Sequence, residues 1–489
     1  MALKRVVLSI LTGLVVLVMG SSLIDSWSRP QVTGQLQLYQ SNLLLQASEW
    51  VGLETEEFKP LRQALLGAEP LQTVAKQYRQ VRDEATEVLA RAQERGDSQP
   101  APTQTVIDQL QSILDDIDLK LGIIAIAQGE PDQGRQRWQP LAAATGPTAP
   151  VAQALLDLWA TPPRLGPTTE IAITENLSGW FQYRALEQLY TVDERPADLE
   201  QLQLQEQQTA QETLVKLGLV GTLPVVGCIL GLGILIFLVA QRLLRGDSSL
   251  IGQAVSGWEV PWDGIVIWQV LIVGFFFVGQ LLLPFLLGLS GLSMADTSSR
   301  GRALYSMVFY LLMSASGIGV LVASIWSYRP LPKDWFRLQV LGRWPLWGAG
   351  GYLVALPLML AVAAINQKLW QGQGGNNPLL QAVLQESDPV ALLLFFLTAA
   401  VAAPLFEEAL FRGFLLPSLT RYMPVWGAIL LSSFIFAAAH LSLSEIIPLT
   451  LLGAILAWVY TRSRNLLAPM LLHSLWNSAT LAGLFLLGS

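Results

Sequence analysis

The sequence predicts an all-α polytopic membrane protein, with about nine transmembrane helices and a helical extramembrane domain inserted after the first. Of its 489 residues, 52% are hydrophobic and 14% are charged, whereas about 25% are charged in soluble proteins. The charge is also uneven, because 27 of the 37 acidic residues precede Thr213. An acidic block therefore precedes a membrane block, and a single soluble domain is excluded.

Nine apolar windows are the candidate spans, since a spanning helix needs about 20 apolar residues. They cover residues 6–24, 217–240, 264–288, 303–326, 344–365, a run that begins at 390, 425–439, 446–460 and 466–487. The windows 425–439 and 446–460 are short for a full span. The first window follows Lys4 and Arg5, and no cleavage site follows it, so an uncleaved anchor is favoured over a removed signal peptide.

The basic residues orient these spans, because loops rich in Lys and Arg stay in the cytoplasm. If every window crosses, the N-terminus is cytoplasmic, and the inside loops hold more Arg and Lys than the outside ones. Residues 25–212 then lie in a periplasm or a lumen. No transit-peptide-like start precedes the first span, so we expect a multi-pass protein of a bacterial inner membrane rather than a thylakoid one.

Four regions follow from these boundaries: an anchor at 1–24, an acidic Gln-rich domain at 25–212, spans two to five at 213–372, and a last membrane domain at 373–489. Apolar residues three and four apart predict amphipathic helices in the acidic domain. One stretch of it faintly resembles a tetratricopeptide-type helix pair, without a clear second copy. A docking domain for an unknown partner is favoured over an inert spacer. The charge pattern does not favour nucleic acid as a partner.

Three ionisable residues, Glu407, Glu408 and Arg412, interrupt an apolar stretch that resumes at Phe414. Such groups cost about 2.5–3.5 kcal/mol each at membrane depth, so they are functional candidates. Glu408 and Arg412 are four residues apart with the acid first, which predicts an ion pair on one helix face. Glu407 lies about 100° further round and lacks that partner, so it is the candidate general base. A helix end at the headgroup level is the simpler alternative.

The chain has two histidines, His440 and His473, and both follow the acid pair. Antiparallel helices would bring Glu407 and His440 to one depth, whereas His473 starts two or three turns short of it. His473 and Asn477 are four residues apart, so imidazole and carboxamide share a face and are able to stabilise an oxyanion. The alternatives are packing roles for both histidines, or a zinc site formed by Glu407, His440 and His473.

Three motifs in the last hundred residues resemble the signatures of the CPBP intramembrane proteases, a group that includes CAAX prenyl proteases and bacteriocin-processing or immunity proteins. They read Glu407-Glu408-Ala-Leu-Phe-Arg412, Phe436-Ala-Ala-Ala-His440 and His473-Ser-Leu-Trp-Asn477, in the family's order. The resemblance implies that Glu408 and Arg412 position the first motif, and that Phe436 supports the second. It identifies residues 373–489 as the catalytic membrane domain.

The resemblance also assigns the chemistry. It implies that Glu407 and His440 activate the water that attacks a peptide carbonyl, while His473 and Asn477 stabilise the oxyanion. The leading hypothesis is therefore an intramembrane endopeptidase acting on a membrane protein or peptide in the lipid bilayer. The rival is a non-catalytic scaffold or immunity-type binding protein. The sequence leaves open whether zinc takes part and whether the substrate is prenylated.

Overall fold

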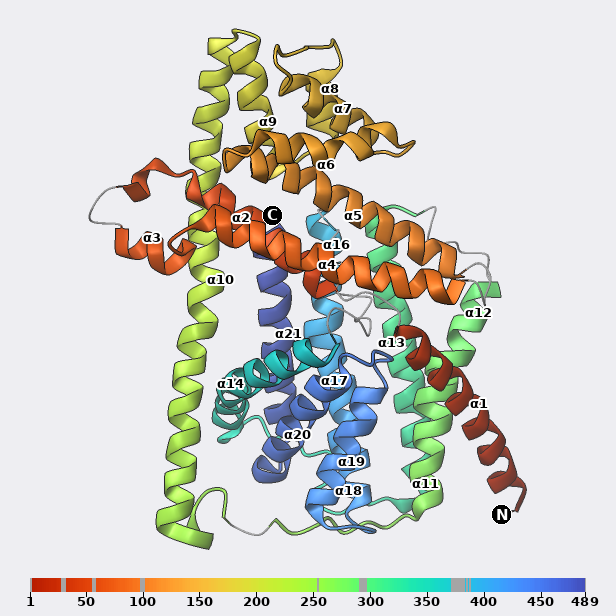
Figure 1. Ribbon diagram of the computed structural model, residues 1–489. Helices are drawn as coiled ribbons and strands as arrows, with labels where there is room; N and C mark the ends of the chain where they lie inside the picture. The colour runs from red at the N-terminus through yellow and green to blue at the C-terminus, as the bar shows by residue number, and fades with distance from the viewer. Residues whose placement is uncertain are drawn as a thin grey trace. The chain divides into compact units, whose positions relative to one another are not determined.

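The computed structural model describes residues 2–27, 32–54, 59–96, 102–252, 255–289, 297–370, 383, 386 and 388–488 (Figure 1). Every regular element among these residues is a helix, which confirms the all-α prediction. The chain forms two compact units. One, here called the membrane unit, combines the first helix with the chain from Leu223 onward. The other, here called the acidic unit, holds the helices between the first one and Thr222.

The acidic unit is a succession of helices in which α4 packs against α5, α5 against α6 and α6 against α7. Its elements are α2 (Val32–Ser48), η1 (Val51–Glu54), α3 (Lys59–Leu66), α4 (Pro70–Gly96), α5 (Pro102–Ala127), α6 (Pro131–Ala143), α7 (Ala149–Leu158), α8 (Thr169–Asn176), α9 (Gly179–Val192) and the first half of α10 (Pro196–Arg245). The fully buried Trp138 of α6 donates from Nε1 to the carbonyl of Leu119, at 2.9 Å. A Cβ at Gly122 would lie 2.1 Å from that indole nitrogen, so only glycine allows α5 and α6 to pack this closely.

The membrane unit begins with α1 and resumes in the second half of α10. Its elements are α1 (Ala2–Ser26), η2 (Gly246–Ser248), α11 (Gly264–Gln269), η3 (Val270–Leu282), α12 (Leu283–Leu289), α13 (Ser299–Ile325), η4 (Trp326–Tyr328), α14 (Trp344–Trp370), α16 (Pro389–Phe396), η5 (Leu397–Ala402), α17 (Ala403–Glu407), η6 (Glu408–Leu415), α18 (Leu416–Leu419), α19 (Val425–Ala438), α20 (Ile446–Ser463) and α21 (Leu467–Gly488). All nine predicted windows are therefore helical.

Seven helices within the described residues are long and apolar enough to cross a membrane. They are Ala2–Ser26, Pro196–Ser248, Gly264–Leu289, Ser299–Tyr328, Trp344–Trp370, Pro389–Leu419 and Ile446–Ser463. The predicted count of nine is not confirmed, because neither α19, which has 14 residues, nor α21 is among these seven helices.

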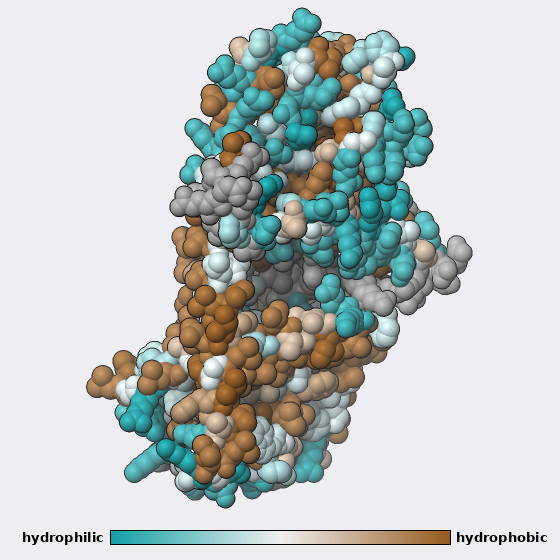
Figure 2. All heavy atoms as spheres, turned by 60° about the vertical axis from the view of Figure 1, so that its left-hand side comes forward, coloured by the Kyte–Doolittle hydropathy of each residue, from teal (hydrophilic) through white to brown (hydrophobic). Residues whose placement is uncertain are grey.

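The outer surface of the spanning helices is hydrophobic, as the brown side chains of Figure 2 show. On α10, Leu223, Ile229 and Ile236 are each more than 60% exposed. Such exposed apolar residues along one helix are rare on soluble proteins and are expected where lipid surrounds the helix. The chain is thus an integral, multi-pass membrane protein.

The segment from α16 to α18 carries the first motif. It begins at Pro389 because the Asp388 side chain accepts hydrogen bonds from the backbone N–H groups of Val390 and Ala391, at 2.8 and 3.2 Å. Two π-helical stretches, η5 and η6, widen it on either side of Glu407. Such wide turns are frequent at functional sites. The helix α21 packs against η5 and α17, and α19 and α20 pack against η6, so the three motifs meet.

Candidate active site

A buried ion pair lies at the centre of the site. Arg412 Nη1 donates to Glu408 Oε1 at 2.9 Å, and the two side chains are 1% and 0% exposed. Arg412 Nη2 also donates to the carbonyl of Gly453, at 3.0 Å. The spacing of four residues predicts this pair, and the structure contains it. Removing either partner would leave an uncompensated buried charge. The bond from Arg412 to Gly453 holds η6 against α20.

His473 joins the ion pair through its Nδ1, which lies 2.8 Å from Glu408 Oε1. A carboxylate accepts hydrogen bonds only, so Nδ1 carries the proton and Nε2 is left for other contacts. That nitrogen lies 3.9 Å from Glu407 Oε2. The gap in depth that the sequence predicts for His473 is therefore closed by the packing of α21 against α17.

Glu407 is held by a residue that the sequence did not point to. The hydroxyl of Tyr310, on α13, donates to Glu407 Oε1 at 2.8 Å. The other oxygen, Oε2, is buried and has no hydrogen-bond partner within the described residues. In the part of the chain that the structure describes, Glu407 forms no ion pair with Arg412, whereas Glu408 does, and Tyr310 is a hydrogen-bond partner that helix spacing does not predict. The only sequence signal for Tyr310 is a polar aromatic residue inside an apolar window, which ordinary packing would also explain.

Phe436 connects the three motifs. Its buried ring lies 4.9 Å from the ring of His440 and 5.9 Å from that of His473, centroid to centroid. The guanidinium carbon of Arg412 lies 4.5 Å from the same ring, within the range of a cation–π contact. This phenyl ring therefore separates the two imidazoles and covers one face of the ion pair.

His440 lies in the turn that follows α19. Its Nδ1 is 2.9 Å from the carbonyl oxygen of Phe436, so Nδ1 donates and the neutral ring presents Nε2 as an acceptor. The turn continues through Leu441, which has a positive φ of 56°. The backbone N–H of Leu443 donates to Ser26 Oγ at 3.2 Å, so α1 helps to fix this turn.

Asn477 is engaged with the backbone of η5. Its Nδ2 donates to the carbonyl of Ala399 at 2.7 Å, and the neighbouring Ser474 Oγ donates to that of Ala400 at 2.6 Å. Both bonds hold α21 against the π-helical stretch. An oxyanion would have to use the second hydrogen of the Asn477 amide, and this role stays a prediction.

The predicted zinc ligands are Glu407, His440 and His473. Within the described residues, no group of three or more His, Cys, Asp or Glu side chains is arranged to hold a metal ion. His473 in addition uses one ring nitrogen to bond Glu408. As described, these residues do not fit a three-ligand zinc centre, and we assign no catalytic step to a metal. The zinc site is one alternative for these residues, and it stays a hypothesis.

Comparison with known proteins matches this part of the chain to one family. Residues 389–479 match the family described as type II CAAX prenyl endopeptidase Rce1-like. This range includes every residue of the three motifs. The match confirms the resemblance to the CPBP proteases, and it does not extend to the acidic unit.

Three bacterial proteins are similar to the chain. "Putative membrane peptidase YdiL" of Bacillus subtilis (strain 168) is 26% identical over 166 residues, which are 33% of this chain and 67% of that protein. An "Uncharacterized 24.3 kDa protein" of Escherichia coli is 35% identical over 101 residues, 20% of this chain and 46% of its own length. "UPF0177 protein YxdF" of Lactococcus lactis subsp. lactis (strain IL1403) is 35% identical over 75 residues, 15% and 41% of the two chains.

These alignments cover two thirds of the first relative and less than half of the other two. No solved structure matches the chain.

Proposed function

We propose that the membrane unit is an intramembrane endopeptidase that hydrolyses a peptide bond of a membrane-associated protein or peptide, with Glu407 as the general base. The observation that carries the proposal is the buried Glu407 Oε2, which has no hydrogen-bond partner within the described residues and lies 3.9 Å from His473 Nε2. Polar groups at membrane depth are energetically costly, so a buried carboxylate oxygen in this position is a candidate for a functional group. The family match and the relative named as a membrane peptidase support the proposal.

The proposed reaction begins with a water molecule bound at Glu407 Oε2. Tyr310 orients the carboxylate through Oε1, so the second oxygen is the one that accepts the proton of the water. The resulting hydroxide forms a bond to the carbonyl carbon of the peptide, and the carbonyl oxygen takes up the negative charge. Collapse of this intermediate breaks the C–N bond, and the leaving nitrogen receives the proton from Glu407.

The histidines have separate roles in this proposal. His440 Nε2 is an acceptor that helps to hold and activate the water. His473 stabilises the oxyanion when its ring is doubly protonated, since Nδ1–H is already given to Glu408 and Nε2–H is then the available donor. Arg412 balances the charge of Glu408, so that the buried carboxylate orients the ring of His473.

Turnover by the purified full-length chain in proteoliposomes tests the proposal. The substrate is the membrane polypeptide that accumulates uncut in cells expressing the Glu407→Gln variant, identified by comparison with cells expressing the wild-type chain. Glu407→Gln should abolish cleavage, whereas Glu259→Gln, an exposed acid in the loop before α11, should not change it. Undiminished cleavage by the Glu407→Gln variant would contradict the general-base role.

The substrate is a membrane-associated peptide segment, and the family description suggests that it carries a prenyl group. Matched peptides with and without a farnesyl thioether distinguish the two cases. A prenyl-directed enzyme would cleave only the farnesylated one, whereas a general intramembrane protease would cleave both. Activity after exhaustive chelation, with zinc measured by elemental analysis, tests metal dependence in the same assay.

A non-catalytic scaffold is the second candidate. It is favoured by the use of Glu408, Arg412, Asn477 and one nitrogen of His473 in bonds between helices. In a scaffold, Glu407→Gln would leave partner binding and cellular phenotype unchanged. Loss of both cleavage and phenotype in this variant, with an unchanged melting temperature, would contradict the scaffold.

A further inference from the structure

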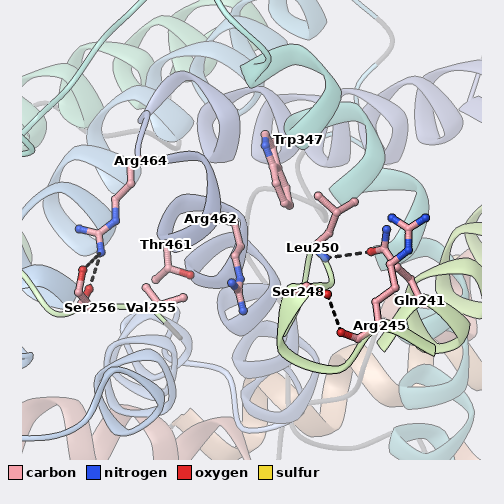
Figure 3. Close-up of a pocket in the computed structure, with 10 residues that line it drawn as sticks. All are labelled: Gln241, Arg245, Ser248, Leu250, Val255, Ser256, Trp347, Thr461, Arg462 and Arg464. Atoms are coloured by element: carbon pink, nitrogen blue, oxygen red, sulfur yellow. Dashed lines mark hydrogen bonds between the residues drawn. The ribbon is translucent and has the colours of Figure 1, made fainter. Parts of the chain in front are cut away.

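A cavity of about 340 Å³ lies where membrane helices end in the membrane unit (Figure 3). Its volume falls in the range of about 300–1,000 Å³ typical of cavities that hold small ligands. The residues that line it come from the end of α10, the loop that follows, the first turn of α14 and the end of α20: Gln241, Arg245, Ser248, Leu250, Val255, Ser256, Trp347, Thr461, Arg462 and Arg464. We call this cavity the basic pocket. None of these residues belongs to the Glu407 site.

The charge of the basic pocket has one sign. Three arginines line it, and no carboxylate does among the described residues. Asp247, in the loop after α10, pairs with Arg242 at 3.0 Å, and Asp334 forms an ion pair with Arg464 at 4.0 Å. A group of arginines around one cavity attracts an anion, and the planar guanidinium matches the oxygens of a phosphate.

The loop that forms one wall is folded rather than extended. Leu250 N–H donates to Gln241 Oε1 at 2.9 Å, and Ser249 Oγ donates to the carbonyl of Gly246 at 2.7 Å. A Cβ at Gly252 would lie 2.3 Å from that same carbonyl oxygen, so the turn requires glycine there. The wall is therefore a defined structure that keeps Ser248 and Arg245 beside the cavity.

The arginines of α20 form the opposite wall. Arg462 Nη2 donates to the carbonyl of Ile251 at 2.7 Å, and Arg464 donates to the carbonyl of Ser256 while its guanidinium stacks on Trp258 at 3.7 Å. In Figure 3, the side chain of Arg462 lies between those of Thr461 and Ser248. These contacts fix the position of each guanidinium beside the cavity.

Two simpler roles of arginines at helix ends do not account for the cavity. Arginines there balance the helix dipole and orient the spans, but both roles are fulfilled on an open surface. An exposed leucine also lines the pocket: the side chain of Leu250 is 51% exposed. A lipid with its phosphate in the pocket would lay an acyl chain over this side chain. Basic pockets at the ends of spanning helices bind anionic headgroups in this way.

We propose that the basic pocket binds a phosphate group, which Arg245 and Arg462 contact through their guanidinium groups and Ser256 through its hydroxyl. The two sources of this chemistry are the headgroup of an anionic phospholipid and free phosphate. The site is independent of the proposed peptidase activity, because the two share no residue.

The test uses the full-length chain in nanodiscs of phosphatidylcholine, either alone or mixed with phosphatidylglycerol in equal parts. Phosphatidylglycerol that stays bound is counted by native mass spectrometry, and thermal unfolding is followed in parallel. We expect Arg245→Gln to weaken phosphatidylglycerol binding about fivefold, since one arginine contributes about that factor near an anionic headgroup. Arg242→Gln is the matched control, because it removes the same charge one turn earlier on α10 and does not line the pocket.

Inorganic phosphate added to phosphatidylcholine nanodiscs separates the two sources. If it stabilises the wild-type chain and not the Arg245→Gln variant, the ligand is a free phosphate; if only phosphatidylglycerol does so, the ligand is a headgroup. Arg462→Gln should give the same loss, but it also removes the bond to Ile251, and Arg245→Gln, on an exposed side chain, remains informative if that variant does not fold. Equal binding of both probes by wild type and Arg245→Gln, or equal losses in Arg242→Gln and Arg245→Gln, would overturn the proposal.

Discussion

The Glu407 site and the basic pocket lie in one unit, and each contains buried or half-buried arginine, but they differ in how that charge is balanced. Arg412 is almost fully buried and pairs with Glu408, which is itself bonded to His473. Arg245, Arg462 and Arg464 face a cavity with no carboxylate among its described lining residues. An arginine paired with a buried carboxylate fixes the side chains around it. An arginine that faces a cavity without a carboxylate attracts an anionic ligand.

The largest effect on turnover should follow from changing Glu407, whose Oε2 has no hydrogen-bond partner within the described residues. Glu407→Gln keeps the shape of the side chain and removes its basicity, so turnover should fall by about 10²–10⁴, the contribution typical of a general base. Initial rates of peptide cleavage in proteoliposomes measure it, with Glu259→Gln as the control. A variant that retains more than half of the wild-type rate would remove the distinction between this site and a structural ion pair.

Breaking the buried ion pair of Glu408 and Arg412 should lower the stability of the fold more than any substitution in the basic pocket. Glu408→Ala leaves Arg412 buried without its carboxylate, and a loss of about 3–5 kcal/mol in the free energy of unfolding is expected for a broken buried pair. Thermal unfolding in nanodiscs compares it with Arg245→Ala, whose exposed side chain should change stability little in phosphatidylcholine. Similar melting temperatures for the two variants would show that Arg412 does not depend on Glu408.

The contact of Tyr310 with Glu407 should have a smaller effect. Tyr310→Phe removes only the hydroxyl, and a hydrogen bond to a charged group contributes about 1.5–3 kcal/mol, so we expect kcat to fall at least about tenfold with KM unchanged. Tyr305→Phe, on the same helix, is the matched control. A rise in KM without a change in kcat would assign Tyr310 to substrate binding instead of the orientation of Glu407.

The smallest expected effect is that of salt concentration, which should act on ligand binding in the basic pocket and not on the buried ion pair. Charges open to solvent are screened over about 8 Å at physiological ionic strength, whereas buried pairs are screened much less. Raising the salt concentration should therefore weaken phosphatidylglycerol retention and leave the melting temperature in phosphatidylcholine nearly unchanged. An equal salt dependence of both quantities would show that the two arginine environments do not differ in this way.

Most of the helical fold was predictable from hydropathy, because a span requires a long apolar run whatever it packs against. Hydropathy does not predict where a helix ends when its polar residues are also helical. The apolar window 217–240 covers only part of α10, which begins at Pro196 and has 50 residues. Within the site, the Glu408–Arg412 pair was predictable from its spacing alone. The bond between His473 and Glu408 joins residues 65 apart, and that between Tyr310 and Glu407 joins residues 97 apart, so both depend on tertiary packing that spacing does not contain.

The basic pocket was not predicted for the same reason. Arg462 and Ile251 are 211 residues apart, and the cavity exists only because the loop after α10 folds against the end of α20. In the sequence, these arginines are indistinguishable from the loop residues that orient the spans.

The shared contact at Phe436 makes the motifs interdependent under mutation. Its ring touches both imidazoles and lies over the guanidinium of Arg412. Effects of substitutions at residues with a common neighbour do not add. Single substitutions of His440, His473 and Arg412 would each disturb the packing of the same ring, so their summed losses should exceed the loss in the triple variant. Among related sequences, we expect these four positions to vary together rather than one at a time.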